Sequence, residues 1–262
     1  MKNEYTVKQP KVSVIMPAYN AERFIEEAIR SVMAQTVSDW ELLVLDDGSQ
    51  DATADIVKRL AQEDDRIRFL PNGANMGVAK TRNRGFDLCT GAYIALLDSD
   101  DVWYPEKLEK QLMLAKESNA DILYCSYSII DENGAKKCSD YLVPEHTDFN
   151  AFLAQSVISC STAMLSRAII DQYRFTTSFY HEDLALWLRL LQDGFQARGN
   201  REVLSAYRVM RGTRASNKLK SACNRWRTFR KYLGLPFGKC LVAMIRYAVF
   251  GLCKYRRVKT AA

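Results

Sequence analysis

Apolar runs and amphipathic stretches alternate along the first half of the chain. Runs in which nearly every residue is apolar predict buried strands at 11–17, 40–45, 66–70 and 93–97. Between them, apolar residues recur at helical spacing and predict helices at 21–36, from about Asp51 onward, and at 75–89. Strands that are apolar throughout and alternate with helices are typical of a parallel sheet covered on both faces. We therefore expect residues 1–116 to form a Rossmann-like α/β unit.

The second half of the chain has a weaker pattern. A helix is expected to begin near Pro105, and apolar runs predict strands at 120–131, 160–166 and 203–209. The stretch 182–194 has helical spacing and ends at a glycine, so it predicts another helix. The expected fold class is α/β, with a mostly parallel central sheet flanked by helices and with further helices at the C-terminus.

The last part of the chain is apolar and basic at once. Residues 239–257 hold about 14 mostly apolar residues interrupted by Arg246, whereas a membrane-spanning helix needs roughly 20 without interruption. This pattern predicts a basic amphipathic helix that lies in the headgroup plane of a membrane. The alternative is a helix packed back on the domain with its arginines in water.

Charge is distributed unevenly along the chain. Residues 201–262 contain 16 Lys and Arg residues and one acidic residue, Glu202, so this segment carries +15. The whole chain carries +6, which leaves +6 − 15 = −9 on residues 1–200. An acidic body with a basic tail indicates an anionic partner surface, either a membrane or a nucleic acid. Seven cysteines without a C-x-x-C spacing, and no recognisable signal peptide, favour reduced thiols in the cytoplasm.

Polar residues follow each of the first four predicted strands. Ligands of open α/β sheets bind beyond the carboxyl ends of the strands, so these residues are expected to share one rim. They are Pro17 to Asn20, Asp46 to Ser49, Asn72 and Gly73, and Asp98 to Asp100. Asp98 and Asp100 are two positions apart, so on extended backbone both side chains point the same way. Carboxylates in this arrangement suit Mg²⁺ or Mn²⁺. The alternative is a solvated acidic turn that caps the following helix.

Two further groups of acidic residues have both a structural and a functional interpretation. Asp46 and Asp47 precede Gly48, and Asp-Gly is common in turns for purely local reasons. Glu182 and Asp183 begin a predicted helix, where acidic side chains complement the helix dipole, but either could serve as a general base. The sequence has neither a G-x-G-x-x-G motif after a strand nor a phosphate-binding G-x-x-x-x-G-K-[ST] motif.

The stretches "VSVIMPAYNAERFIEEAIRSVMAQTVSDWELLVLDDGSQDAT", "NMGVAKTRNRGF" and "GAYIALLDSDDVWYPEKL" closely resemble glycosyltransferase family 2, whose members have the GT-A fold. The resemblance runs in order over residues 11–116, and "HEDLALWLRLL" is similar to the later acidic motif of the family. Within the family, the chain looks most like short bacterial enzymes that build surface polysaccharide or teichuronic-type polymers.

The resemblance implies an inverting transfer from a nucleotide-diphosphate sugar, most often a UDP-sugar, with Mn²⁺ or Mg²⁺. It also implies roles for individual residues of this chain. Asp183 is the expected catalytic base with Glu182 beside it, Asp100 is the direct metal ligand, and Asp98 lies by the ribose and the metal. The remaining nucleotide-sugar-binding residues are Pro17 and Tyr19 along the nucleoside, Asp47 at the base edge, Ser99, and Arg82 (or Lys80) near the base or diphosphate.

Processive members of the family carry a Q-x-x-R-W motif and transmembrane helices. This chain has Arg225-Trp226, but Ala222 stands where the glutamine would be, so we expect transfer of a single sugar. The expected acceptor is a glycan or lipid-linked glycan, reached from the cytoplasmic face of the inner membrane through the basic C-terminal helices, with no nucleic acid as partner. The expected domains are 1–210, divided into a nucleotide-sugar half (11–116) and an acceptor half (117–210), and a basic helical segment (211–262).

Three alternatives account for fewer of these features. A nucleotidyltransferase acting on a sugar phosphate should have a glycine-rich, basic loop after its first strand, where this chain has "PAYNAERF". A haloacid-dehalogenase-type phosphatase would use Asp98 as nucleophile, but its motif belongs on the first strand of the domain. A non-enzymatic module that binds a membrane or nucleic acid through the tail leaves the acidic rim unexplained.

Overall fold

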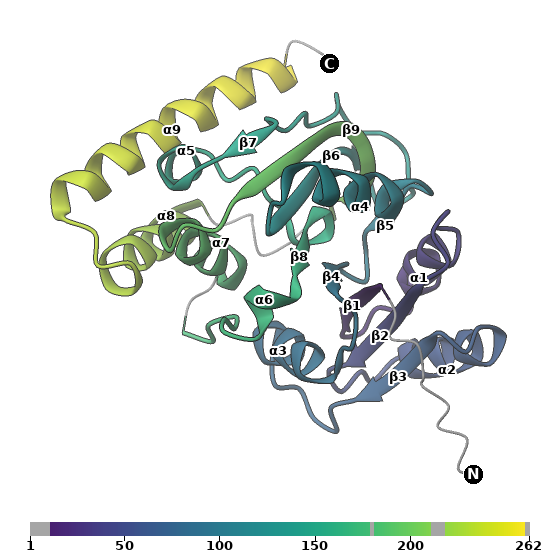
Figure 1. Ribbon diagram of the computed structural model, residues 1–262. Coiled ribbons are helices and arrows are strands. Elements are labelled where there is room, and N and C mark those ends of the chain that lie inside the picture. The colour runs from purple at the N-terminus through teal and green to yellow at the C-terminus, as the bar shows by residue number, and fades with distance from the viewer. Residues whose placement is uncertain (1–10, 179–180, 211–217, 260–262) are drawn as a thin grey trace.

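The computed structural model describes residues 11–178, 181–210 and 218–259 (Figure 1). The first four long strands form the parallel half of the sheet, in the order β3-β2-β1-β4. Their bounds are Val12–Ala18 for β1, Trp40–Asp46 for β2, Ile67–Pro71 for β3 and Tyr93–Leu96 for β4. Each lies within a few residues of its predicted range, which confirms the parallel α/β unit.

Helices cover both faces of this half-sheet because alternate strand residues point to opposite sides. Val14 and Val44 belong to the apolar cluster under α1, α2 and α4, whereas Ile15 and Leu45 pack toward α3 and α7. The bounds are Ile25–Met33 for α1, Thr53–Glu63 for α2, Val78–Leu88 for α3, Lys107–Ser118 for α4 and Glu182–Gln192 for α7. Strands β1 and β2 therefore lie at the centre of the molecule, because their apolar side chains must be covered on both faces of the sheet.

The second half of the sheet continues the order as β8-β6-β9-β5, and β7 pairs with β9. Antiparallel pairings of β8, β5 and β7 make the sheet of the described residues mixed as a whole, although β6 and β9 are parallel. The bounds are Val102–Trp103 for β5, Ile122–Ile130 for β6, His146–Thr147 for β7, Met164–Ser166 for β8 and Ala197–Arg208 for β9.

Two elements of this half have bounds that differ from the predicted ones. The strand expected over 160–166 begins as a 3₁₀ turn, η1 (Cys160–Thr162), and only Met164–Ser166 pairs in the sheet. The late strand expected over 203–209 starts earlier, at Ala197, because residues 197–200 also pair with β6 before the register shifts at Val203. Two short helices, α5 (Phe149–Ala154) and α6 (Arg167–Ile170), lie in the connections.

Helices α8 (Lys218–Arg227) and α9 (Phe237–Lys259) end the described chain, with a π-helical turn, η3 (Thr228–Tyr232), after α8. Helix α9 runs along one side of the molecule and packs on α5 (Figure 1). Cys240 and Ala243 are buried in that contact. Within the described residues, none of the helices combines the length and the apolar content that crossing a membrane requires. The predicted basic segment thus has one packed face; residues 211–217 and 260–262 lie outside the described part of the chain.

Candidate active site

The acidic loop between β4 and β5 carries three carboxylates with different surroundings. Asp101 is buried: the Ser161 hydroxyl donates to its Oδ2 at 2.5 Å, and the Arg208 backbone N–H donates to its Oδ1 at 2.8 Å. Burial, with the neighbouring Asp100 and Asp98 adding to it, raises the pKa of Asp101 well above its ordinary value. Asp101 therefore anchors the loop to η1 and β9 and is not exposed to a ligand.

Asp98 and Asp100 face the rim. The Asp98 side chain is 33% exposed, and Asp100 is partly exposed. Burial, followed by the charge of Asp98, raises the pKa of Asp100 to about 6, and the charges of Arg208 and Arg82 oppose this shift. Among the described residues, no three His, Cys, Asp or Glu side chains lie close enough to hold a metal ion by themselves. The pair fits a divalent cation that takes its other ligands from a diphosphate, as Mg²⁺ commonly does.

Arg82 joins the acidic loop to the start of α7. Its Nη2 donates to Asp98 Oδ1 at 2.5 Å, and its Nη1 donates to Glu182 Oε1 at 2.7 Å. The Arg82 side chain is only 5% exposed, and its guanidinium lies 5.2 Å from the centre of the Phe175 ring. The resemblance implies a place near the base or diphosphate, whereas here the guanidinium is held between two site carboxylates. Lys80, the alternative in that alignment, is exposed.

The residues after β1 and β2 form the neighbouring part of the rim. Asp47 accepts hydrogen bonds from Asn72 Nδ2 at 2.8 Å and from the backbone N–H groups of Met76 and Gly77, both at 2.9 Å. It thereby shapes the loop before α3. Tyr19 is 50% exposed at the end of β1, where it offers a ring face to solvent, whereas Pro17 is buried in the strand. Ser99 is partly exposed beside Asp98.

Glu182 and Asp183 are neighbours in the first turn of α7 but have different environments. The Glu182 side chain is 13% exposed and pairs with Arg82; burial raises its pKa, and Arg82 opposes the shift. Asp183 is partly exposed, and its Oδ1 accepts from the backbone N–H of Leu184 at 2.7 Å. His181 precedes them, and its Nε2 lies 3.2 Å from the Ser221 hydroxyl of α8. The geometry leaves Asp183 as the carboxylate available to a ligand.

Two residues near Asp183 were missed as site residues. Arg225 of α8 is buried, bonds to the Ser156 hydroxyl at 2.9 Å, and interacts electrostatically with Asp183. Its only sequence signal is the Arg-Trp pair. Tyr207 of β9 is half-buried, and burial raises its pKa, followed by the charges of Asp101, Asp98, Asp100 and Asp183. Tyr207 thus lies among the carboxylates of the site, which no local pattern around it indicates.

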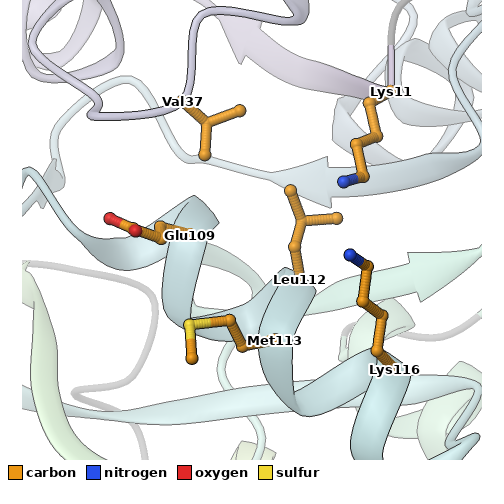
Figure 2. A pocket seen from close by; sticks show the side chains of 6 residues that line it. All are labelled: Lys11, Val37, Glu109, Leu112, Met113 and Lys116. Atoms are coloured by element: carbon orange, nitrogen blue, oxygen red, sulfur yellow. The ribbon is translucent and has the colours of Figure 1, made fainter.

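A small cavity of about 130 Å³ lies elsewhere, at the end of β1 that is opposite to the acidic rim. It is lined by Lys11, Val37, Glu109, Leu112, Met113 and Lys116 (Figure 2). None of these residues belongs to the predicted site. The carboxyl ends of the strands, and not this cavity, therefore hold the chemistry-bearing side chains.

Comparison with known proteins places this geometry in a family. Residues 13–174 match the model of glycosyl transferase family 2. The putative teichuronic acid biosynthesis glycosyltransferase TuaG of Bacillus subtilis is 36% identical over 240 residues, which cover 92% of this chain and 95% of TuaG. The Escherichia coli enzyme WfgD, a UDP-Glc:α-D-GlcNAc-diphosphoundecaprenol β-1,3-glucosyltransferase, is 35% identical over 246 residues, covering 93% of this chain and 94% of WfgD.

Solved structures agree with the fold. The crystal structure of S. aureus TarS residues 1–349 in complex with UDP-GlcNAc superposes with a TM-score of 0.71 at 21% identity, over 84% of this chain and 64% of that chain. The mannosyltransferase PcManGT of Pyrobaculum calidifontis, in complex with GDP-Man and Mn²⁺, gives 0.69 at 16% identity, over 97% and 73%. The expected GT-A fold is confirmed, and the nucleotidyltransferase and phosphatase alternatives are left without support.

Proposed function

The chain belongs to glycosyltransferase family 2, and from this membership and the geometry of the rim we propose that it transfers one sugar, with inversion, from a UDP-sugar to a hydroxyl of a lipid-linked glycan. The observation that carries the proposal is the rim itself. Asp98 and Asp100 lie two residues apart at the rim, and Arg82 joins Asp98 to Glu182 on the helix that carries Asp183. Arg82 thereby links the proposed donor-binding carboxylate to the helix of the proposed base.

The donor side is proposed from the rim residues and from the relatives. WfgD acts on UDP-Glc, and TarS was crystallised with UDP-GlcNAc, which together favour a UDP-sugar. Tyr19 and Pro17 would lie along the nucleoside, Asp47 at the base edge, and Asp98 and Ser99 near the ribose and diphosphate. Asp98 and Asp100 would hold Mn²⁺ or Mg²⁺, which would neutralise the departing diphosphate as a Lewis acid.

The chemical step proposed is a single displacement. The acceptor oxygen forms a bond to the anomeric carbon while the bond from that carbon to the UDP oxygen breaks on the opposite face, which inverts the configuration. Asp183 takes the proton of the acceptor hydroxyl, a contribution typically worth about 10²- to 10⁴-fold in rate. Glu182 is a poor candidate for this role because its carboxylate is already paired with Arg82.

The acceptor side is proposed from helix α9. Phe237, Leu241, Val242, Ile245, Val249 and Phe250 of this helix are all large apolar residues and are all at least 45% exposed. Exposed basic residues, among them Lys239 and Arg246, accompany them. An apolar face with basic neighbours fits the anionic inner surface of a membrane, where a lipid-linked acceptor is found. On this proposal residues 11–116 bind the donor, residues 117–210 bind the acceptor, and the C-terminal helices contact the membrane.

Calorimetric titration of UDP into the purified protein, with and without Mn²⁺, tests the proposal, and GDP, CDP and dTDP serve as nucleotide controls. We expect UDP to bind in preference to the others and only with metal. Asp100→Ala should abolish metal-dependent binding, and Asp55→Ala, a change of an exposed carboxylate on α2, should leave it intact. Asp183→Asn should keep UDP affinity but abolish transfer. Absence of binding by every nucleotide, or equal binding with and without metal, would refute the proposed donor site.

A further inference from the structure

Three tyrosines form an aromatic cluster on the second half of the sheet. The rings of Tyr127 and Tyr141 are stacked, with centroids 5.0 Å apart and an interplanar angle of 28°. Tyr207 meets Tyr127 edge-on at 6.0 Å. We call Tyr127, Tyr141 and Tyr207 the tyrosine cluster. All three residues are half-buried.

The sheet register brings the cluster to the acidic rim. Tyr207 is one residue before Arg208, whose backbone N–H bonds to Asp101 and whose Nε bonds to the Asp100 carbonyl at 2.8 Å. Successive strand residues point to opposite faces, so Tyr207 lies on the face opposite to the Arg208 side chain. Because β6 and β9 pair with Ile129 opposite Tyr207, Tyr127 is its diagonal neighbour on that face.

Tyr207 lies on the same face of the sheet as helix α7, which carries the proposed base Asp183. Its phenol interacts electrostatically with Asp101, Asp98 and Asp100 of the acidic loop and with Asp183 at the start of α7. Gln155 donates from Nε2 to the Tyr141 hydroxyl at 2.9 Å and fixes the far end of the cluster. The cluster thus forms an ordered aromatic wall that begins at the reaction centre and leads away from it.

We propose that the tyrosine cluster is the subsite for the terminal pyranose ring of the acceptor, with Tyr207 next to the hydroxyl that reacts. A pyranose presents C–H groups on its face and hydroxyls on its rim, so it suits an aromatic wall beside carboxylates that accept hydrogen bonds. The inference rests on the proposed function, because it names what binds on the acceptor side of that site.

Saturation-transfer NMR tests the inference without knowledge of the natural acceptor. The probes are methyl glycosides of glucose, galactose, mannose, rhamnose, N-acetylglucosamine and N-acetylgalactosamine, added to the protein saturated with UDP and Mg²⁺. We expect at least one glycoside to receive saturation from the wild-type protein. Tyr207→Leu and Tyr127→Leu should weaken that binding by about tenfold, the scale of a lost stacking contact.

Two matched variants separate ring contact from damage to the fold. Tyr207→Phe keeps the ring and should retain binding within about threefold, whereas Tyr93→Leu removes a half-buried ring at the opposite end of β4 and should have no effect. Failure of every glycoside to bind, or equal binding by Tyr207→Leu and wild type, would overturn the inference. UDP affinity is measured on the same samples. If UDP binds but no glycoside does, only the acceptor subsite is refuted. If UDP does not bind the wild type, the proposed function is refuted, and the subsite with it.

Discussion

Removal of the Arg82 guanidinium should damage the fold and the site together. Arg82 donates to two carboxylates from elements far apart in the chain, Asp98 before β5 and Glu182 at the start of α7. The substitution Arg82→Met keeps most of the aliphatic volume but removes both ion pairs. It leaves Glu182, with a side chain only 13% exposed, without its positive partner.

The size of the effect follows from burial. Breaking a buried ion pair from one side costs about 3–5 kcal/mol, mostly because the remaining charge is left uncompensated. Asp98 is a third exposed and water can replace part of its lost interaction, so the Glu182 pair dominates. We take a loss of about 4 kcal/mol in the free energy of unfolding, which at a urea m-value of about 3 kcal/mol/M lowers the midpoint by roughly 1.3 M.

Urea unfolding followed by circular dichroism measures this change. In the double variant Arg82→Met/Glu182→Gln, the uncompensated carboxylate is gone, so we expect the protein to regain about 1–2 kcal/mol relative to Arg82→Met alone. The matched control is Arg59→Met, since Arg59 is 49% exposed and pairs with Glu26 and Glu63 at the surface, where under about 1 kcal/mol is expected. A midpoint for Arg82→Met equal to that of Arg59→Met, or no recovery in the double variant, would refute the reasoning.

Three other changes have defined outcomes. Burial lowers the pKa of Lys107 from its ordinary value of 10.5 to about 8, so the folded protein loses this proton first, and the contribution of Lys107 to the free energy of unfolding should rise by about 3 kcal/mol between pH 8 and 10.5. Lys107→Met should remove that rise and stabilise the protein below pH 8. If the difference in urea midpoint between Lys107→Met and the wild type is the same at pH 7.5 and at pH 10, this reasoning is contradicted. Ile245→Glu on α9 should reduce sedimentation with anionic vesicles severalfold, whereas Met113→Glu on α4, equally exposed, should not; equal sedimentation of the two variants would exclude α9 as the contact. Asp47→Ala should weaken UDP binding at least tenfold in calorimetry, because it releases the loop at 72–77; unchanged affinity would show that the loop does not shape the nucleotide site.

The parallel half of the sheet could be predicted because strands that are buried on both faces consist largely of consecutive apolar residues. Strand β2 is buried at every position, and four of its residues, 42–45, are apolar in a row. Strand β9 could be predicted only in part, because its first half, with Asn200, Arg201 and Glu202, is polar and partly exposed where its pairing with β6 is irregular. Pairing by backbone hydrogen bonds can include polar residues that no apolar period indicates.

The site could be predicted where it depends on position after a strand. Asp98 and Asp100 stand where the architecture places ligands, so the rim was visible in the sequence. The Arg82 bridge was not, because its two partners lie 16 and 100 residues away and no local pattern relates them. Tyr207 and Arg225 were missed for the same reason: each comes near the candidate site only through the packing of β9 or α8 against segments distant in sequence.

Helix geometry gives the two acidic neighbours Glu182 and Asp183 different surroundings. Successive residues of an α-helix are about 100° apart around the axis, since there are 3.6 residues per turn, so Glu182 and Asp183 cannot face the same surroundings. Glu182 turns toward the buried guanidinium of Arg82 and becomes its counter-ion, whereas Asp183 remains partly exposed and accepts from the first turn of α7. A counter-ion that took up the acceptor proton would weaken its pairing with Arg82, and Arg82 would in turn hold Asp98 less well. On the proposed mechanism the proton therefore goes to Asp183, and Glu182, through Arg82, keeps the proposed donor-side carboxylate Asp98 in place during the transfer.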